Sequence, residues 1–353
     1  MTGQSPISGV PTNIITGFLG SGKTTAILHL LKAKPANERW AILVNEFGEI
    51  GIDGSLFESQ HTEKQGVFIK EVPGGCMCCT AGLPMQVALN TLLSKARPDR
   101  LLIEPTGLGH PIEVLESLSS DPFKAVLNIQ KIITLVDARN LSDERYTRNE
   151  IFNQQISIAD IIVGNKSDLY EQGDLVNLEH YAKTQGSEKS KLLTTEHGQL
   201  DIEVVGGKTE SEPHAHHDHD HHQHDHDHLH SHDHEHHNDH EQTVSVTEAP
   251  IPEAGYLKVK NSGEEFHSIG WRFAQDVSFK SDAIEDFLSG LSAERAKAVV
   301  CTDAGPLGYN LTSDGLSKTL LNECSEGRVE IIADMIKDDW ETALLACRQL
   351  AAV

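Results

Sequence analysis

The sequence predicts an α/β protein with a mostly parallel sheet, followed by a smaller C-terminal α+β domain. Three observations predict it. Residues 12–205 alternate short apolar runs with amphipathic stretches, which is typical of strand–helix–strand units around a parallel sheet. A glycine-rich motif directly follows the first apolar run. Within residues 254–353, alternating and helical apolar patterns resume after a long polar stretch.

The order of the elements follows from these patterns. For the first domain we expect six strands, near Asn13–Thr16, Trp40–Asn45, Val67–Val72, Leu101–Glu104, Lys131–Val136 and Ile161–Gly164. One helix begins inside the glycine-rich motif and runs to about Leu31, and another spans roughly Leu83–Lys95. In the second domain we expect strands at Ile269–Phe273 and Ala296–Thr302, and a closing helix at Asp338–Leu350.

Composition and charge limit the class of protein. The chain has 353 residues, 38% of them apolar, and a formal net charge of −24. This charge argues against nucleic-acid binding through a basic surface. No stretch approaches the ~18 consecutive apolar residues of a membrane span, and residues 1–10 lack the pattern of a signal peptide, so we expect a cytoplasmic protein. Six cysteines in a chain of this size do not suggest a secreted disulfide framework.

The glycine-rich motif is a phosphate-binding loop. Gly17–Thr24 fits the pattern G-x-x-x-x-G-K-[ST], follows an apolar strand and opens a helix. Its backbone N–H groups can surround phosphate, Lys23 can reach the outer phosphates, and the Thr24 hydroxyl can bind Mg²⁺. We therefore expect the nucleotide to contact Gly17, Gly20, Ser21, Gly22, Lys23, Thr24 and Thr25, with Lys23 and Thr24 acting in catalysis.

A second motif selects the base. Asn165, Lys166 and Asp168 belong to the run Asn-Lys-Ser-Asp, directly after the apolar strand Ile161–Val163. The Asp168 carboxylate can accept hydrogen bonds from N1–H and the 2-amino group of guanine, and adenine lacks this pair of donors. The motif therefore predicts that the chain binds GTP rather than ATP.

The segment Glu104–Gly107 stands where a magnesium-binding acid is expected in such folds. Glu104 ends a strand and can hold the Mg²⁺ shell together with Thr24. Gly107 lets the backbone approach the γ-phosphate, so this segment can respond to hydrolysis. We therefore expect Glu104 to act in catalysis and Gly107 to contact the nucleotide.

These motifs divide the chain. We expect an N-terminal extension at residues 1–11, a P-loop GTPase domain at 12–205 and a C-terminal α+β domain at 254–353. Residues 206–253 form the linker between them, and His214 to His240 within it holds fifteen histidines interleaved with acidic residues. Such a segment cannot bury enough apolar surface to fold alone, so we expect it to be disordered without metal.

Three thiols lie within four residues of the first domain. Cys76, Cys78 and Cys79 follow Pro73-Gly74-Gly75, whose glycines permit the turn that would bring the side chains together. Three thiolates favour zinc or another thiophilic ion over Mg²⁺. Glu46 is our preferred fourth ligand, with Glu49 as the other possibility. A redox loop and buried unliganded cysteines are the alternatives.

The histidine tract is a second metal-binding candidate. Neutral imidazoles at this density can bind several Zn²⁺, Ni²⁺, Co²⁺ or Cu²⁺ ions with little selectivity. The tract from His214 to His240 could load the cysteine site, store metal or merely solvate the chain. We expect metal binding, auxiliary to the cysteines.

With these residues in view, the chain resembles the CobW-like metal-handling GTPases, a branch of the SIMIBI P-loop proteins with relatives in hydrogenase and urease maturation. Glu104–Gly107 is similar to the family's Glu-x-x-Gly signature, and Gly75–Cys79 to its Gly-Cys-x-Cys-Cys metal site. The motifs that carry the resemblance are Gly17–Thr25, Asn45–Glu49, Gly74–Cys79, Glu104–Gly107 and Asn165–Asp168. Residues 254–353 match the family's C-terminal domain only loosely.

The resemblance implies a GTP-hydrolysing metallochaperone that binds zinc and delivers it to client proteins. GTP, Mg²⁺ and Zn²⁺ would be its cofactors and a client metalloprotein its partner, and homodimer formation is possible. Two other functions stay open. The cargo could be cobalt or nickel, for corrinoid or nickel-enzyme maturation, or the chain could be mainly a metal buffer. No water-positioning residue or arginine finger can be named from the sequence.

Overall fold

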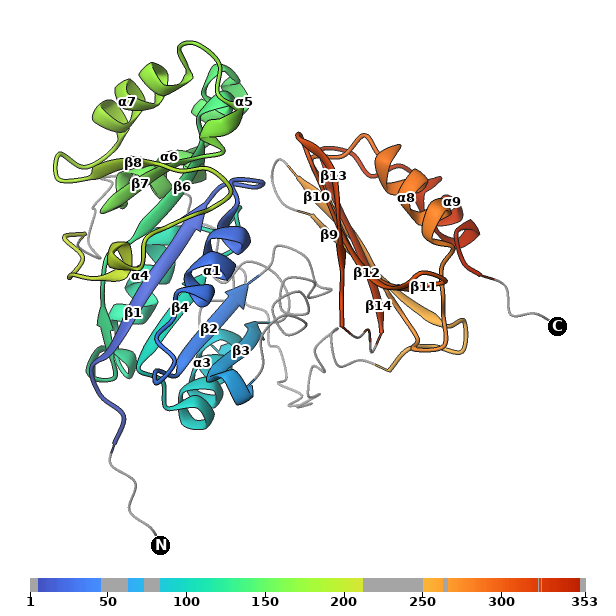
Figure 1. The fold of residues 1–353 in the computed structure, drawn as a ribbon, viewed down its shortest axis with the longest axis horizontal. Coiled ribbons are helices and arrows are strands. Elements are labelled where there is room, and N and C mark those ends of the chain that lie inside the picture. Colours follow the sequence, from blue (N-terminus) through green and yellow to red (C-terminus); the bar gives the residue numbers. More distant parts are fainter. Residues whose placement is uncertain are drawn as a thin grey trace, which may run out of the picture.

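The structure is a computed structural model, and it describes residues 6–45, 63–72, 83–211, 250–262, 266–322, 324 and 326–349. These residues form two sheets in separate parts of the chain (Figure 1). We call residues 6–211 the N-terminal region and residues 250–349 the C-terminal region. The predictions for Glu46, Glu49, Cys76, Cys78, Cys79 and the tract from His214 to His240 lie outside the described residues.

The N-terminal sheet is parallel in every strand pair among the described residues. Its order is β3-β2-β4-β1-β6-β7-β8, with β5 also paired to β1. The expected mostly parallel α/β fold is therefore confirmed. The strands are β1 (Val10–Gly17), β2 (Trp40–Asn45), β3 (Val67–Val72), β4 (Arg100–Glu104), β5 (Leu127–Ile129), β6 (Ile133–Asp137), β7 (Ile161–Asn165) and β8 (Lys191–Thr194).

Helices cover both faces of this sheet, because its central strands are apolar on both sides. Ile14 of β1 packs in one cluster with Leu89 of α3 and Val114 of α4, whereas its neighbour Ile15 packs in another with Ile27 of α1. The helices are α1 (Lys23–Lys32), α3 (Leu83–Ala96), α4 (Pro111–Ser119), α5 (Glu144–Thr147), α6 (Glu150–Ser157) and α7 (Asp174–Gln185). Short 3₁₀ turns are η1 (Glu63–Gln65), η2 (Phe123–Ala125), η3 (Ala138–Ser142), η4 (Ser167–Leu169) and η5 (Ile202–Val205).

The C-terminal sheet is antiparallel, with the order β13-β12-β11-β14-β10-β9. Two helices, α8 and α9, lie on the side of this sheet that faces away from the N-terminal region (Figure 1). The elements are β9 (Tyr256–Ser262), β10 (His267–Phe273), α8 (Ser281–Ser289), β11 (Arg295–Thr302), β12 (Gly305–Thr312), β13 (Gly315–Leu320), β14 (Gly327–Ala333) and α9 (Trp340–Ala346). The expected α+β composition of this part is confirmed.

The two faces of the C-terminal sheet differ in chemistry. In β11 the residues Ala296, Ala298 and Val300 join the apolar core together with Ile284 of α8 and Leu344 of α9. Since successive side chains of a strand point to opposite faces, the residues between them belong to the other face. That face looks toward the N-terminal region (Figure 1).

One expectation needs adjustment. The closing helix is shorter than the range Asp338–Leu350, because α9 ends at Ala346 and Arg348 makes a β-bridge to Phe279. Within the described residues no helix has the length and apolar character to cross a membrane.

Candidate nucleotide site

The phosphate-binding loop connects β1 to α1, as expected. Gly20 and Gly22 have φ angles of 72° and 96°, which favour glycine. A Cβ on Gly22 would lie 2.3 Å from Nδ2 of Asn165, so close packing as well as the backbone angle requires glycine there. Lys23 is buried, and its Nζ donates to the carbonyl oxygens of Gly17 at 2.8 Å and Phe18 at 3.2 Å. These bonds hold the ammonium inside the loop.

Glu104 and Thr24 meet beside this loop. The Thr24 hydroxyl donates to Oε1 of Glu104 at 3.0 Å, and the Glu104 side chain is buried at the end of β4. A carboxylate and a hydroxyl are the hard oxygen donors that Mg²⁺ prefers. The pair therefore fits Mg²⁺, and when bound the ion would neutralise charge on the nucleotide phosphates.

Gly107 lies against the phosphate-binding loop. A Cβ at this position would lie 2.9 Å from the backbone N of Leu19 and 3.1 Å from Nζ of Lys23. The carbonyl oxygen of Gly107 accepts a bond of 3.0 Å from Nε2 of Gln155, which is buried on α6. Sequence reasoning missed Gln155, because nothing in α6 marks one glutamine as facing the Gly107 backbone.

The motif Asn165–Asp168, which we call the base-reading motif after its predicted role, lies beside the same loop. Its residues differ in their contacts. A pocket is lined by Gly20, Thr25, Lys166 and Asp168, as a guanine site would require. Asn165 also lines it but is buried, donating to the Ser21 carbonyl at 2.8 Å and accepting from Gly198 N–H at 3.0 Å. Asn165 thus ties the phosphate-binding loop to the loop around Gly198.

Two further residues beside this motif were not expected. His197, which the sequence shows only as an isolated histidine, lines the pocket, and its Nε2 lies 3.9 Å from Oδ2 of Asp168. The Tyr170 hydroxyl donates to the carbonyl oxygen of Asn165 at 2.8 Å. Burial raises the pKa of Tyr170 to about 12, so its hydroxyl stays a donor at neutral pH. Tyr170 supports the motif through this hydrogen bond, and no pattern in the sequence predicts the contact.

Comparison with known proteins identifies the family. The family model described as CobW/HypB/UreG, nucleotide-binding domain, matches residues 11–193. This chain belongs to the CobW/HypB/UreG family. The zinc chaperone YeiR of Escherichia coli is 38% identical to it, covering 96% of this chain and 98% of that protein.

Two other relatives match a smaller part of this CobW/HypB/UreG family member. The zinc chaperone CobW of Sinorhizobium is 28% identical, over 58% of this chain and 64% of its own length. The zinc-regulated GTPase metalloprotein activator 1 of Schizosaccharomyces pombe is 30% identical, over 56% of this chain and 48% of its own length. The GTPase class expected from the sequence is therefore confirmed at the level of the family.

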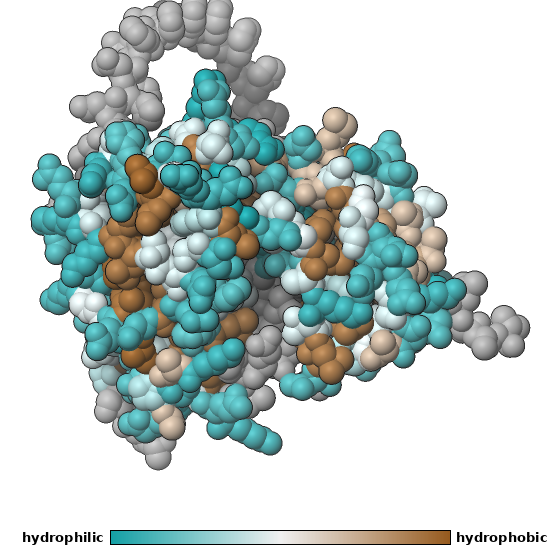
Figure 2. Space-filling view, turned by 45° about the horizontal axis from the view of Figure 1, so that its top comes forward, coloured by the Kyte–Doolittle hydropathy of each residue, from teal (hydrophilic) through white to brown (hydrophobic). Residues whose placement is uncertain are grey.

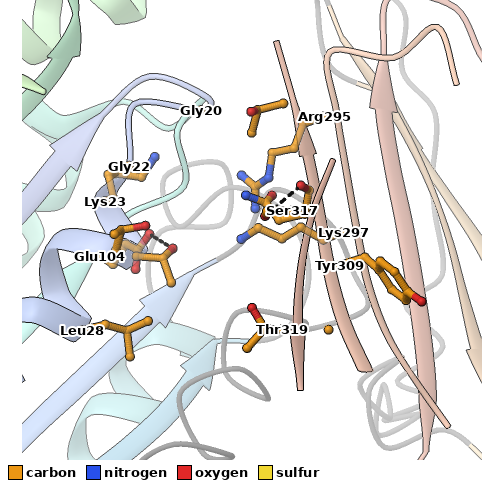
Figure 3. Close-up of a pocket in the computed structure, with 15 residues that line it drawn as sticks. Gly20, Gly22, Lys23, Leu28, Glu104, Arg295, Lys297, Tyr309, Ser317 and Thr319 are labelled. Carbon is orange, nitrogen blue, oxygen red and sulfur yellow. Dashed lines mark hydrogen bonds between the residues drawn. The ribbon is translucent and has the colours of Figure 1, made fainter. Parts of the chain in front are cut away.

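In this family member the C-terminal sheet forms the opposite wall of a pocket at the candidate nucleotide site. A pocket between the two regions is lined on one side by Gly22, Lys23, Thr24 and Glu104, and on the other by residues of β11, β12 and β13. Figure 2 shows the hollow between the two regions on one face of the molecule. In Figure 3 the side chains of the two walls face each other across this pocket. Sequence reasoning placed no residue of the C-terminal region at this site.

A network of ion pairs connects the C-terminal region to the base-reading motif. Asp314 lies in the turn between β12 and β13, and its carboxylate pairs with Nη2 of Arg139 at 2.6 Å and with Nζ of Lys166 at 2.5 Å. Both cations also pair with the buried carboxylate of Asp137, at 2.5 Å and 3.3 Å respectively. Burial by itself would raise the pKa of Asp314, but hydrogen bonds from Lys166 and Arg139 outweigh it and lower the pKa overall.

This lowered pKa predicts how the contact depends on pH. A carboxyl group whose pKa is lower when folded stabilises the protein above its unfolded pKa of about 3.9, and the contribution disappears as the pH falls through the folded pKa. Asp314→Asn should therefore lower the free energy of unfolding by roughly 1 kcal/mol at pH 7, given the partial exposure of these charges. Below about pH 4 the variant and the wild type should converge. Denaturant unfolding at pH 7 and pH 3.5 measures both differences, and a difference that stayed constant between these pH values would contradict the assignment.

The proposed metal ligands cannot be placed in the same way. The cysteine motif follows β3 in the sequence and Glu46 follows β2, and both lie outside the described residues. Among the residues that the structure describes, no group of three or more His, Cys, Asp or Glu side chains could hold a metal ion. Cys301 and Cys324 are half-buried and Cys347 is buried, which favours a structural role for these three thiols.

Proposed function

We propose that this chain is a GTP-hydrolysing metallochaperone that binds zinc and delivers it to client proteins in a GTP-dependent manner. The arrangement of three strand ends is the observation that supports it most. Glu104 of β4 is in register with Val44 of β2, and Asn45 of β2 is in register with Val72 of β3. β2 and β3 therefore end at the edge of the sheet where Glu104 ends β4, the edge at which α/β folds place their ligands. Glu46 directly follows β2 in the sequence, and the cysteine motif follows β3.

The roles of the nucleotide-site residues follow from their positions. Lys23 would bind the outer phosphates, and Thr24 and Glu104 would hold Mg²⁺. Asp168 would accept the two guanine hydrogen bonds, with Asn165 and Lys166 fixing the loop around it. The backbone of Gly107 would face the γ-phosphate and move when that phosphate leaves.

Zinc is proposed as cargo because three thiolates form a soft ligand set, and three relatives carry names that refer to zinc. Cobalt or nickel is the second candidate, since the fifteen histidines between His214 and His240 suit these ions as well. The client protein, and a homodimer across the nucleotide, stay predictions.

The proposal predicts that nucleotide and metal affinities are linked. Zinc affinity, measured by competition with a chromophoric chelator, should differ between the GTPγS-bound and GDP-bound forms by about 5- to 150-fold. Linkage requires that zinc shift the relative affinities for GTPγS and GDP by the same factor. Parallel titrations with Co²⁺ and Ni²⁺ show which cargo responds most to the nucleotide.

Substitution of the cysteines provides the control. Replacing Cys76, Cys78 and Cys79 by serine should remove the nucleotide-dependent metal site and the linkage, while GTP still binds. Cys347→Ala removes a buried thiol of the C-terminal region instead and should retain the linkage. Equal zinc affinity in the GTPγS-bound and GDP-bound wild type would contradict GTP-dependent delivery and would favour a metal buffer.

A further inference from the structure

Two cations of the C-terminal sheet lie in the wall opposite the phosphate-binding loop. Arg295 and Lys297 are the first and third residues of β11, and both line the pocket that Lys23, Thr24 and Glu104 line from the other side. They are 8% and 7% exposed. In Figure 3 the side chains of Arg295 and Lys297 point toward the phosphate-binding loop, whereas Tyr309 points away from it.

The alternation of side chains between the two faces of β11 accounts for this placement. Ala296 and Ala298 belong to the apolar core under α8 and α9, so Arg295 and Lys297 share the opposite face. Directly across from Lys297 on β14 is Glu330, which is also buried. An apolar side chain at either position would cost less free energy on folding than a cation, because burying a charge costs several kcal/mol before its partners compensate. Because both side chains also line the pocket, the two cations point to a role at this site.

Contacts between the two regions hold the start of β11 in place. Glu294, the residue before Arg295, accepts a hydrogen bond of 2.9 Å from the Tyr146 hydroxyl, and one of its oxygens lies 3.7 Å from Nη1 of Arg145. Ile332, which is in register with Arg295, packs in one apolar cluster with Phe18 of the phosphate-binding loop. The position of Arg295 is thus tied to the N-terminal region through the preceding residue Glu294 and through Ile332 of β14.

The charge of the pocket indicates its ligand. Among the described residues, its lining contains three cations, Lys23, Arg295 and Lys297, and one carboxylate, Glu104. This lining is positive in a chain whose net charge is −24. A polyphosphate facing the P-loop is the anion that such a pocket fits, and a guanidinium can bind two phosphate oxygens at once.

We propose that Arg295 and Lys297 complete the nucleotide site from the C-terminal region, binding the β- and γ-phosphates opposite Lys23. In hydrolysis the water oxygen forms a bond to the γ-phosphorus, the bond from this phosphorus to the bridging oxygen breaks, and the proton of the water leaves with inorganic phosphate. Negative charge develops on the bridging oxygen and on the transferred group, and Arg295 and Lys297 stabilise it. The C-terminal region thereby supplies in the same chain the cation that many GTPases receive from a partner. This inference rests on the proposed GTP hydrolysis.

The test separates phosphate contact from structural support. Arg295→Gln and Lys297→Met should each weaken GTPγS binding at least about 10-fold and leave GMP binding within about 2-fold, because only the β- and γ-phosphates are contacted. The kcat for GTP hydrolysis should fall about 10²- to 10³-fold for Arg295→Gln. Arg295→Lys should recover part of the GTPγS affinity but less of kcat, since an ammonium lacks the planar fork. Competition with a fluorescent nucleotide gives the affinities of the full chain.

A matched variant controls for damage to the sheet. Arg272 is another buried arginine of this sheet, but its guanidinium pairs with Glu326 at 2.9 Å and does not line the pocket. Arg272→Gln should therefore leave kcat and the ratio of GTPγS to GMP affinity unchanged, whatever its melting temperature. If Arg295→Gln and Lys297→Met change GTPγS and GMP binding equally, or leave both kcat and GTPγS binding intact, the proposal is overturned.

Failure of the proposed function would look different. A wild-type chain that binds GTP but does not hydrolyse it would contradict the proposed GTPase activity, and the comparison of GTPγS with GMP would still decide whether the two cations contact phosphate. Normal hydrolysis in Arg295→Gln together with its loss in Lys23→Ala would overturn this inference and leave the proposed function standing.

Discussion

Lys23→Ala should reduce kcat/KM for GTP at least about 10²- to 10³-fold. Lys23 is the cation at the centre of the phosphate-binding loop, and its ammonium is held by the carbonyl oxygens of Gly17 and Phe18. A bound triphosphate would place its outer oxygens beside this ammonium, where the surrounding protein excludes water and strengthens the attraction. Alanine removes the charge and leaves a space that water can fill.

Two measurements distinguish this loss from misfolding. A ligand that binds only the folded state at 100 times its Kd stabilises the protein by about 2.7 kcal/mol, so the wild type should melt at a higher temperature with GTPγS and Mg²⁺. Lys23→Ala should lose most of this shift while melting cooperatively by itself. Lys32→Ala removes the same charge from the exposed C-terminal end of α1 and should keep both the shift and kcat/KM. A normal kcat/KM in Lys23→Ala would remove the P-loop from the proposed mechanism.

The motif residues were predictable because each motif carries its own structural context. Gly17–Thr24 requires a strand before it and a helix after it, and β1 and α1 provide them. Glu104 and Asn165 each end a parallel strand, and parallel strands place their carboxyl ends at one edge of the sheet. The local sequence pattern and the topology of a parallel sheet are therefore enough to predict that these residues lie close together.

The opposite wall was not predictable in this way. Arg295 and Lys297 alternate with Ala296 and Ala298, which predicts a strand with one polar face but does not say what that face contacts. Asp314 stands before Gly315, and Asp-Gly is an ordinary hairpin turn in sequence. Its pairing with Lys166 depends on packing between segments 148 residues apart. Sequence patterns report local geometry, and these contacts depend on how two sheets meet.

The contacts of Asn165 and Lys166 in the base-reading motif were also not predictable from the sequence. The sequence assigns the base contact to Asp168, but it does not show that Asn165 is buried against the phosphate-binding loop or that Lys166 is paired with Asp137 and Asp314. Asp168 lines the pocket, and 26% of its side chain is exposed. The neighbouring side chains thus fix the loop, and the carboxylate lines the pocket, as the base contact proposed for it requires.

Asp168→Asn should exchange the preference for GTP with one for xanthosine triphosphate. Guanine presents two donors, N1–H and the 2-amino group, and a carboxylate accepts from both. Xanthine has N1–H and a carbonyl at position 2, which match the oxygen and the NH₂ group of an asparagine amide. Hydrogen bonds to a charged group contribute about 1.5–3 kcal/mol each, so kcat/KM for GTP should fall about 10²-fold or more and the value for xanthosine triphosphate should rise.

The ratio of the two kcat/KM values is the informative measurement, because a general loss of folding lowers both and leaves the ratio unchanged. Asp174→Asn provides a matched control, since Asp174 begins α7 close in sequence but accepts from Glu171 N–H and does not line the pocket. An Asp168→Asn variant that still prefers GTP would mean that another group reads the base. His197 is the first residue to test in that event, since its ring lines the same pocket beside Asp168.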